Sequence, residues 1–213
     1  ENIKSLDELI TVPAAALKGG GTSSGLKEGE QLAARDLLYL AILRSGSDAC
    51  RTLALFSAGT EEDFVALMNK KAADLEMSDT NYTNSYGLDD YNQQTTVNDL
   101  YKLIKYASSN ADFMEICGTQ FKYIAETNLS EKRNILTGNL MIVSGQGKVP
   151  AYYYRYASGV ISTYSEKAGY CVATIGRKNN MTNICIVMDS TKEENTNNSY
   201  IDAKALLDYS FDN

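Results

Sequence analysis

Two serine-containing segments of this 213-residue chain have spacings that can support nucleophilic chemistry. Residues 24–27 read Ser-Gly-Leu-Lys, and a lysine three residues after a serine can accept its proton when both lie on one face of a helix. Glycines surround this segment and disfavour a helix, so we interpret the pairing of Ser24 with Lys27 as accidental. Residues 45–47 read Ser-Gly-Ser, and the simplest interpretation is that Ser47 caps a following helix.

The chain contains no histidine, which limits its possible chemistry. Ser-His-Asp and Cys-His nucleophiles and His-ligated zinc are excluded, so any proton transfer must use carboxylates, lysine, tyrosine, cysteine or water. The four cysteines lack Cys-x-x-Cys spacing. We interpret them as buried free thiols, although Cys171 and Cys185 could face each other on predicted strands. The sequence therefore predicts no metal site and no cofactor.

Composition and charge indicate a globular chain that does not bind nucleic acid. Twenty basic residues stand against 27 acidic ones, and the net charge of −7 disfavours a surface that tracks phosphates. The content of 44% hydrophobic and 22% charged residues is ordinary for a globular protein. No apolar run approaches the roughly 18 residues that indicate a transmembrane helix.

Hydrophobic periodicity places helices first and strands second. It predicts helices over 31–43, 48–58, from 60 onwards, 96–106 and 110–117, an extended aromatic run at 152–156, strands over 168–177 and 182–189 joined by a turn at 178–180, and a helix over 200–211. This order predicts an α+β fold, in which helices cover an antiparallel sheet. We expect one domain overall, with a lead-in and loop at 1–30, a helical subdomain at 31–118, and the sheet with its final helix at 119–213.

Four stretches, in this order along the chain, carry a family resemblance: 23–30, 36–50, 84–100 and 159–171. The last reads Gly-Val-Ile-Ser-Thr-Tyr-Ser-Glu-Lys-Ala-Gly-Tyr-Cys. Together they resemble the serine-type D-alanyl-D-alanine carboxypeptidases, the low-molecular-mass penicillin-binding proteins. The resemblance implies a β-lactamase/transpeptidase-like fold whose N-terminal part is missing from this chain.

The resemblance also implies a site made of three motifs, which this chain carries in altered form. The family uses Ser-x-x-Lys for the nucleophile and its base, Ser-x-Asn for proton transfer, and Lys-Thr-Gly for the substrate carboxylate. Ser45 occupies the catalytic position of Ser-x-Asn, and Ser47 replaces its asparagine. Lys-Thr-Gly reads Ile161, Ser162 and Thr163. By resemblance, Ser47, Ser162 and Thr163 are the substrate-binding positions.

These departures imply weakened chemistry. Loss of a charge-assisted hydrogen bond from lysine typically removes about 1.5–3 kcal/mol, or roughly 10- to 150-fold in binding. We therefore expect a catalytically impaired family member, inactive alone, that binds peptidoglycan stem peptide or a β-lactam-like ligand. The family implies a bacterial, extracytoplasmic protein, secreted or membrane-anchored.

Two alternatives remain open. One is an active serine carboxypeptidase whose nucleophile lies upstream of residue 1, with Ser162 and a displaced cation, Lys167 or Arg155, receiving the substrate. The other is a structural or protein-interaction domain that uses the tyrosine-rich run 152–156, because tyrosine is common at interfaces.

We also expect an N-terminal segment, or a protein partner, to complete the fold. In the family fold the segment before Glu1 supplies strands and a buried helix, without which the apolar faces of 31–43 and 168–189 lack partners. Mass spectrometry of the natural protein should find additional residues before Glu1. A natural N-terminus at Glu1 together with a cooperative melt would contradict this expectation.

Overall fold

The computed structural model describes residues 3–145, 151–193 and 196–213. Contacts group the chain into two compact units that alternate along the sequence. The first unit contains Glu1–Asp74, Thr80–Gln94 and Phe121–Leu136, and the second contains Leu75–Asp79, Thr95–Gln120 and Thr137–Asn213. The division into segments 1–30, 31–118 and 119–213 stays a prediction.

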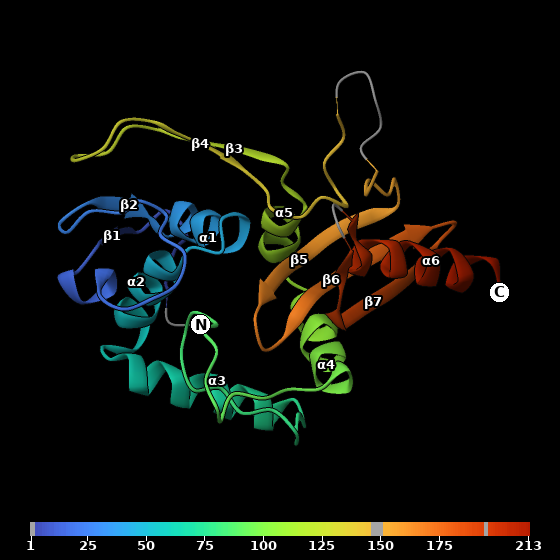
Figure 1. The fold of residues 1–213 in the computed structure, drawn as a ribbon. Coiled ribbons are helices and arrows are strands. Elements are labelled where there is room, and N and C mark those ends of the chain that lie inside the picture. Colours follow the sequence, from blue (N-terminus) through green and yellow to red (C-terminus); the bar gives the residue numbers. More distant parts are fainter. Residues whose placement is uncertain (1–2, 146–150, 194–195) are drawn as a thin grey trace. The chain divides into compact units, whose positions relative to one another are not determined.

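The first unit combines helices with two short antiparallel strand pairs (Figure 1). Its elements are β1 (Leu9–Thr11), the 3-10 helix η1 (Ala14–Leu17), β2 (Gln31–Ala33), α1 (Ala34–Leu43), α2 (Ser47–Ala58), α3 (Glu61–Asp74), β3 (Phe121–Ile124) and β4 (Arg133–Leu136). Strand β1 pairs with β2, and β3 pairs with β4. Ile10, Leu37 and Leu40 are almost completely buried, which shows where the apolar side chains of these elements meet.

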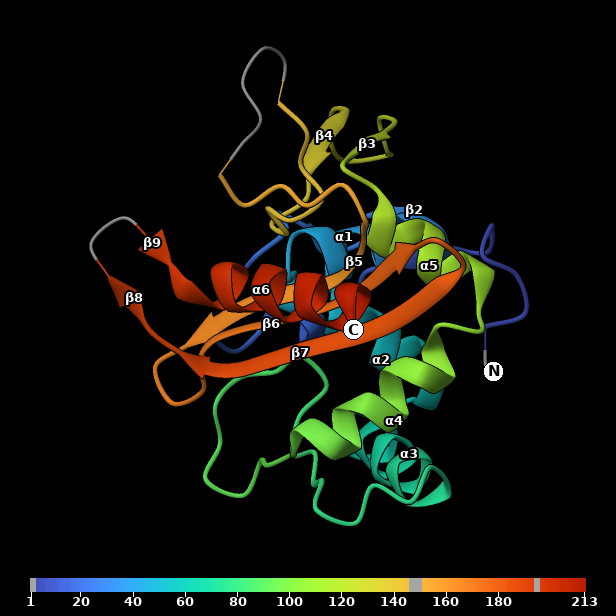
Figure 2. The same cartoon turned by 90° about the vertical axis from the view of Figure 1, so that its right-hand side faces the viewer.

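The second unit is a three-stranded antiparallel sheet with helices on both faces. Its elements are α4 (Val97–Ala107), α5 (Ala111–Gly118), β5 (Ala157–Ser165), β6 (Gly169–Lys178), β7 (Met181–Ser190), the short pair β8 (Lys192–Glu193) and β9 (Thr196–Asn197), and α6 (Asn198–Asp212). Neighbouring strand residues point to opposite faces. Val172 packs with Leu207 of α6, whereas Ala173 packs with Ile104 of α4. Figure 2 shows α6 lying along the sheet.

Several sequence predictions are confirmed at the level of elements. The α+β class is correct, and the hairpin of β6 and β7 turns at Asn179 and Asn180, both of which have positive φ. Asparagine tolerates this left-handed backbone better than most residues, so the turn suits its sequence. Thr60 caps α3, because its hydroxyl accepts a hydrogen bond from the backbone N–H of Asp63 at 3.1 Å. The final helix is confirmed as α6.

Two predicted elements are wrong in part. Residues 31–33 form strand β2 before the helix begins at Ala34, because their backbone pairs with β1. Residues 152–156 form no strand: residues 152, 155 and 156 lie in turns, and side-chain contacts hold the segment in place. Tyr152 packs its ring 4.9 Å from that of Tyr200, and Tyr154 donates a hydrogen bond to Asp208 at 2.7 Å.

All four cysteines are free thiols, as predicted, but only Cys117 and Cys185 are buried, whereas Cys50 and Cys171 are half-buried. Cys171 lies opposite Thr163 and Cys185 lies opposite Thr174, so the two cysteines do not face each other as a pair. Burial raises the pKa of Cys117 to about 12 and that of Cys185 to about 11. Among the described residues, no helix is both long and apolar enough to cross a membrane.

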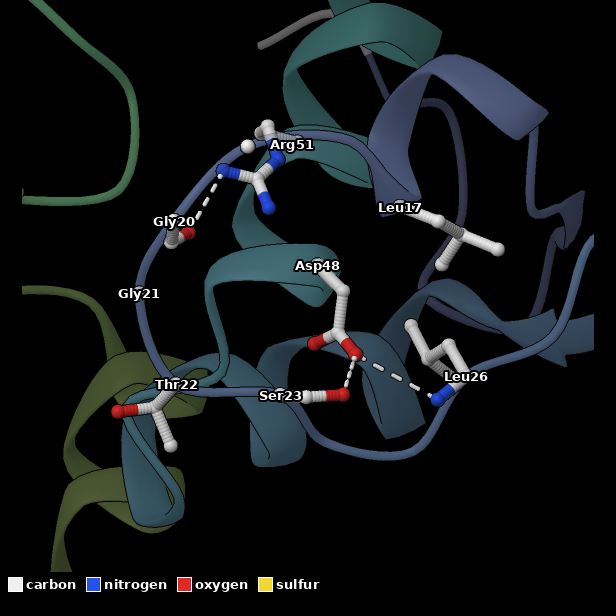
Figure 3. Close-up of a pocket in the computed structure, with 9 residues that line it drawn as sticks. Leu17, Gly20, Gly21, Thr22, Ser23, Leu26, Asp48 and Arg51 are labelled. Atoms are coloured by element: carbon white, nitrogen blue, oxygen red, sulfur yellow. Dashed lines mark hydrogen bonds between the residues drawn. The ribbon is translucent and has the colours of Figure 1, made fainter.

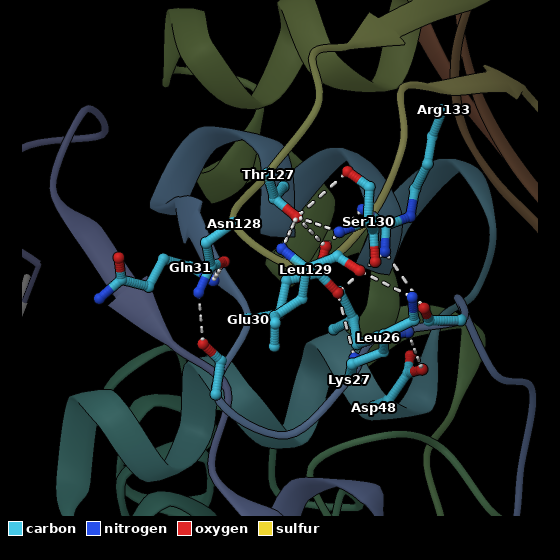
Figure 4. Close-up of polar contacts among 12 residues, drawn as sticks. Leu26, Lys27, Glu30, Gln31, Asp48, Thr127, Asn128, Leu129, Ser130 and Arg133 are labelled. Atoms are coloured by element: carbon cyan, nitrogen blue, oxygen red, sulfur yellow. Dashed lines mark hydrogen bonds and ion pairs between the residues drawn. The ribbon is translucent and has the colours of Figure 1, made fainter.

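A buried ion pair links two distant segments of the first unit (Figure 4). Glu30 is completely buried, and both of its carboxylate oxygens accept hydrogen bonds from Arg133, at 2.7 and 2.9 Å. Thr127 donates a third hydrogen bond at 2.8 Å, and Arg133 also bonds the carbonyl of Gly25. Burial alone would raise the pKa of Glu30, but these hydrogen bonds and the charge of Arg133 lower it overall.

Substitution of Glu30 by glutamine should destabilise the protein by about 3 kcal/mol, because it leaves the Arg133 guanidinium, whose side chain is only 13% exposed, without its counter-charge. For a chain of this size the melting temperature should fall by roughly 6–12 °C, measured by differential scanning calorimetry at pH 7. A group whose folded pKa is lowered stabilises above its ordinary pKa, here 4.5, and loses that effect as the pH falls.

The difference between the wild type and Glu30→Gln should therefore shrink in acid. Glu28→Gln is the matched control, because Glu28 is exposed and two residues away. An equal loss of stability in both variants would contradict the role given to the ion pair.

Candidate functional site

The Ser-Gly-Ser segment forms the turn between α1 and α2 in the first unit. Ser45 is exposed and has a φ of 52°, and Gly46 is the N-cap residue of α2. A Cβ at position 46 would lie 1.8 Å from the hydroxyl oxygen of Ser24, so this close approach requires glycine. The prediction that Ser47 caps α2 is wrong: Ser47 is the first helical residue, it is buried, and its N–H donates to the carbonyl of Thr22 at 2.7 Å.

Asp48 fastens the loop at 22–26 onto the start of α2. Its buried carboxylate accepts hydrogen bonds from the backbone N–H of Ser24 at 2.8 and 2.9 Å, and from the Ser23 hydroxyl at 2.9 Å. The N–H of Leu26 lies 3.4 Å away, and that of Ala49 donates at 2.9 Å. Burial alone would raise the pKa of Asp48, but these donors lower it overall. The charge of Asp48 is thus satisfied by neutral donors.

Arg51 holds the glycine-rich loop one helical turn further along α2. Its Nε donates to the carbonyl of Ala16 at 2.9 Å, and its Nη1 donates to that of Gly20 at 3.2 Å. The guanidinium also lies over the ring of Tyr86, 4.3 Å from the ring centre. The glycine-rich loop and Tyr86 therefore both contact the buried guanidinium that Arg51 of α2 provides.

A pocket of about 200 Å³ opens between this loop and α2 (Figure 3). It is lined by residues 19–23 together with Leu17, Leu26, Asp48 and Arg51. The loop approaches so closely that a Cβ on Gly21 would lie 2.1 Å from the Ser47 hydroxyl oxygen. Ser47 therefore lies directly under the glycine loop that forms one side of the pocket.

Ser24 and Lys27 do not form the helical pair that a Ser-x-x-Lys nucleophile needs. Residues 23–27 are not helical, and the ammonium of Lys27 donates to the carbonyl of Leu129 at 2.7 Å. This geometry agrees with the interpretation that the spacing is accidental.

Strand β5 of the second unit carries the segment that resembles Lys-Thr-Gly. Ile161 is 41% exposed and Thr163 is also exposed. The hydroxyl oxygens of Ser162 and Tyr200 lie 2.6 Å apart, a hydrogen-bond distance. The buried Tyr200 also bonds the carbonyl of Gly138 at 3.2 Å. Ser162 is therefore tied to α6.

The four predicted site residues fall into two groups. Ser45 and Ser47 belong to the first unit, whereas Ser162 and Thr163 belong to the second. Sequence reasoning missed Asp48, Arg51 and Tyr200. An acidic residue in the first turn of a predicted helix is a visible signal for Asp48. The sequence contains no signal for Arg51 or Tyr200, because their partners lie more than 30 residues away.

Comparison with known proteins decides the family. The family model described as D-alanyl-D-alanine carboxypeptidase matches residues 2–192, which is most of the chain. The chain belongs to the D-alanyl-D-alanine carboxypeptidase family. It is 28% identical over 209 residues to D-alanyl-D-alanine carboxypeptidase DacF of Bacillus subtilis, covering 98% of this chain and 50% of DacF. Over 102 residues it is 40% identical to DacD of Salmonella typhimurium, covering 45% of this chain and 26% of DacD.

Solved structures show the same fold. The D-alanyl-D-alanine carboxypeptidase of Mycobacterium tuberculosis matches with a TM-score of 0.86 and 24% identity, over 98% of this chain and 75% of that one. The Streptomyces K15 DD-transpeptidase matches with a TM-score of 0.87 and 22% identity, over 100% and 82%. The predicted transpeptidase-like fold is confirmed. The chain spans about half the length of DacF.

Asp48→Asn should destabilise the protein by about 2 kcal/mol, because an amide cannot accept all the hydrogen bonds that the carboxylate accepts. The amide protons of Ser24 and Leu26 should exchange with solvent faster, as hydrogen-exchange mass spectrometry or NMR would show. The lowered pKa of Asp48 means that this stabilisation is present at neutral pH and lost as the pH falls below about 4.

Asp7→Asn is the control, because Asp7 is an exposed aspartate of the same unit. Unchanged exchange at residues 24 and 26 in Asp48→Asn would show that the carboxylate does not hold the loop.

Proposed function

We propose that this chain is a catalytically impaired member of its family that binds peptidoglycan stem peptide or a β-lactam-like ligand at the bacterial cell envelope, outside the cytoplasm. The observation that carries the proposal is the exposed Ile161 on β5. It occupies the position at which the family's Lys-Thr-Gly motif has its lysine. A substrate carboxylate that approached this strand would meet a branched alkyl group instead of a cation.

The two neighbouring positions support the same proposal. The Ser162 hydroxyl is the nearest equivalent of the family threonine, but it already lies within hydrogen-bond distance of Tyr200. Thr163 replaces a glycine and adds a β-branched side chain along an exposed stretch of strand. Without the cation, about 10- to 150-fold in carboxylate binding is lost, and the extra side chain narrows the approach.

The Ser-Gly-Ser turn of the first unit also supports the proposal that catalysis is impaired. Ser45 is present and exposed, but Ser47 replaces the asparagine and is buried under the glycine loop. The amide that would hold a peptide is therefore absent. Ser45 alone retains the hydroxyl of the Ser-x-Asn motif, so we assign proton transfer to it only as the family position. Ser162 and Thr163 stay the proposed substrate-binding positions on β5, whereas the burial of Ser47 argues against a direct contact between its side chain and a ligand.

The structure weakens the alternative that the tyrosine-rich run at 152–156 forms a protein-interaction surface. Tyr154 is buried, and its hydroxyl bonds Asp208. The Tyr152 hydroxyl accepts a hydrogen bond from the N–H of Asn197 at 2.7 Å. These two side chains serve the packing of the second unit, which leaves less of the run for a partner.

The test uses the natural full-length protein with a fluorescent penicillin and with a stem-peptide mimic ending in D-alanyl-D-alanine. We expect no covalent label and no released D-alanine, but weak reversible binding of the mimic, measured by calorimetry. The double variant Ile161→Lys, Thr163→Gly should tighten that binding at least about tenfold, because it restores one charge-assisted hydrogen bond and the open strand.

Met181→Lys is the matched control, because it adds the same charge at an exposed position of β7. Penicillin labelling of a serine in the wild-type protein, or D-alanine release by it, would overturn the impaired-enzyme proposal in favour of an active carboxypeptidase. Absence of any binding of the mimic would overturn the binding role.

A further inference from the structure

The pocket beside α2 contains a buried cation with unused hydrogen-bonding capacity. Arg51 is only 5% exposed, and its Nε and Nη1 are bonded to backbone carbonyls. Its remaining nitrogen, Nη2, has no hydrogen-bond partner among the described residues. Figure 3 shows this end of the guanidinium directed into the space enclosed by the glycine loop, Leu17, Leu26 and Asp48.

The charge of Arg51 also lacks a directly paired anion. Within the part of the chain that the structure describes, no carboxylate forms an ion pair with it. Asp48 lines the same pocket, but its oxygens are already occupied by hydroxyl and backbone donors. Contact with the Tyr86 ring compensates the cation in part. A buried cation without a counter-ion is costly, so an anion that enters the pocket gains a charge-assisted hydrogen bond.

The geometry points to a binding site for a small carboxylate in this pocket. One guanidinium nitrogen can donate to one carboxylate oxygen, and the residues that line the pocket include no second cation to balance a doubly charged phosphate. The side chains of Leu17 and Leu26 supply apolar walls for a short alkyl group, and about 200 Å³ is enough for a molecule of a few heavy atoms. The site lies wholly in the first unit and is independent of the proposed role of β5.

Ligand-observed NMR titration of the full chain with propionate tests the assignment, with propionamide and inorganic phosphate as comparison probes. Propionate should bind saturably and at least about tenfold more tightly than propionamide, because only the acid is charged. Arg51→Gln should weaken propionate binding at least about tenfold. Arg44→Gln, at an exposed arginine of the same unit, should leave it unchanged.

Leu17→Trp provides a second test that leaves Arg51 intact, in case Arg51→Gln does not fold. The indole should fill the pocket and weaken propionate binding at least about tenfold. Equal binding of propionate and propionamide, tighter binding of phosphate, no saturable binding by the wild type, or unchanged binding in Leu17→Trp would each overturn the assignment. None of these outcomes changes the result expected from the penicillin and stem-peptide test of β5. A failure of the carboxylate site can therefore be distinguished from a failure of the proposed function.

Discussion

The carboxylate of Asp48 is the contact on which the candidate site of the first unit depends. It collects donors from the loop at 23–26 and from the first turn of α2, and so holds the loop over the helix start. Ser47, the glycine loop and the pocket all lie within this arrangement. A buried carboxylate is tolerated here because hydroxyl and backbone donors replace water.

The ion pair of Glu30 with Arg133 extends the same arrangement to the hairpin of β3 and β4. Arg133 donates hydrogen bonds both to Glu30 and to the carbonyl of Gly25, which lies within the loop segment that Asp48 holds. The two acidic groups thus anchor opposite ends of one loop. Both have lowered pKa values despite burial, which shows that their hydrogen bonds outweigh desolvation.

The chain has the fold of its family, but its side chains differ from the family motifs at the positions that resemble them. The fold is that of carboxypeptidases and a transpeptidase, with TM-scores of 0.86 and 0.87. A fold supports many activities, and function has to be argued from the residues at the site. At the strand that resembles Lys-Thr-Gly, an exposed isoleucine stands at the position that resembles the lysine, and the hydroxyl oxygen of Ser162 lies 2.6 Å from that of Tyr200. The family fold is present, while the segments that resemble the family motifs carry other side chains at several positions.

The sequence by itself determined the local elements and the family. The Asn-Asn turn, the Thr60 cap and the final helix follow from short-range preferences, which depend on neighbouring residues alone. Other features depended on the tertiary structure. Strand β2 forms because β1, about twenty residues earlier, supplies its hydrogen bonds. The tyrosine-rich run at 152–156 forms no strand because its side chains pack on α6. The Arg51 pocket and the Ser162–Tyr200 contact have the same origin, since burial and hydrogen bonding between distant residues leave no periodic trace in the sequence.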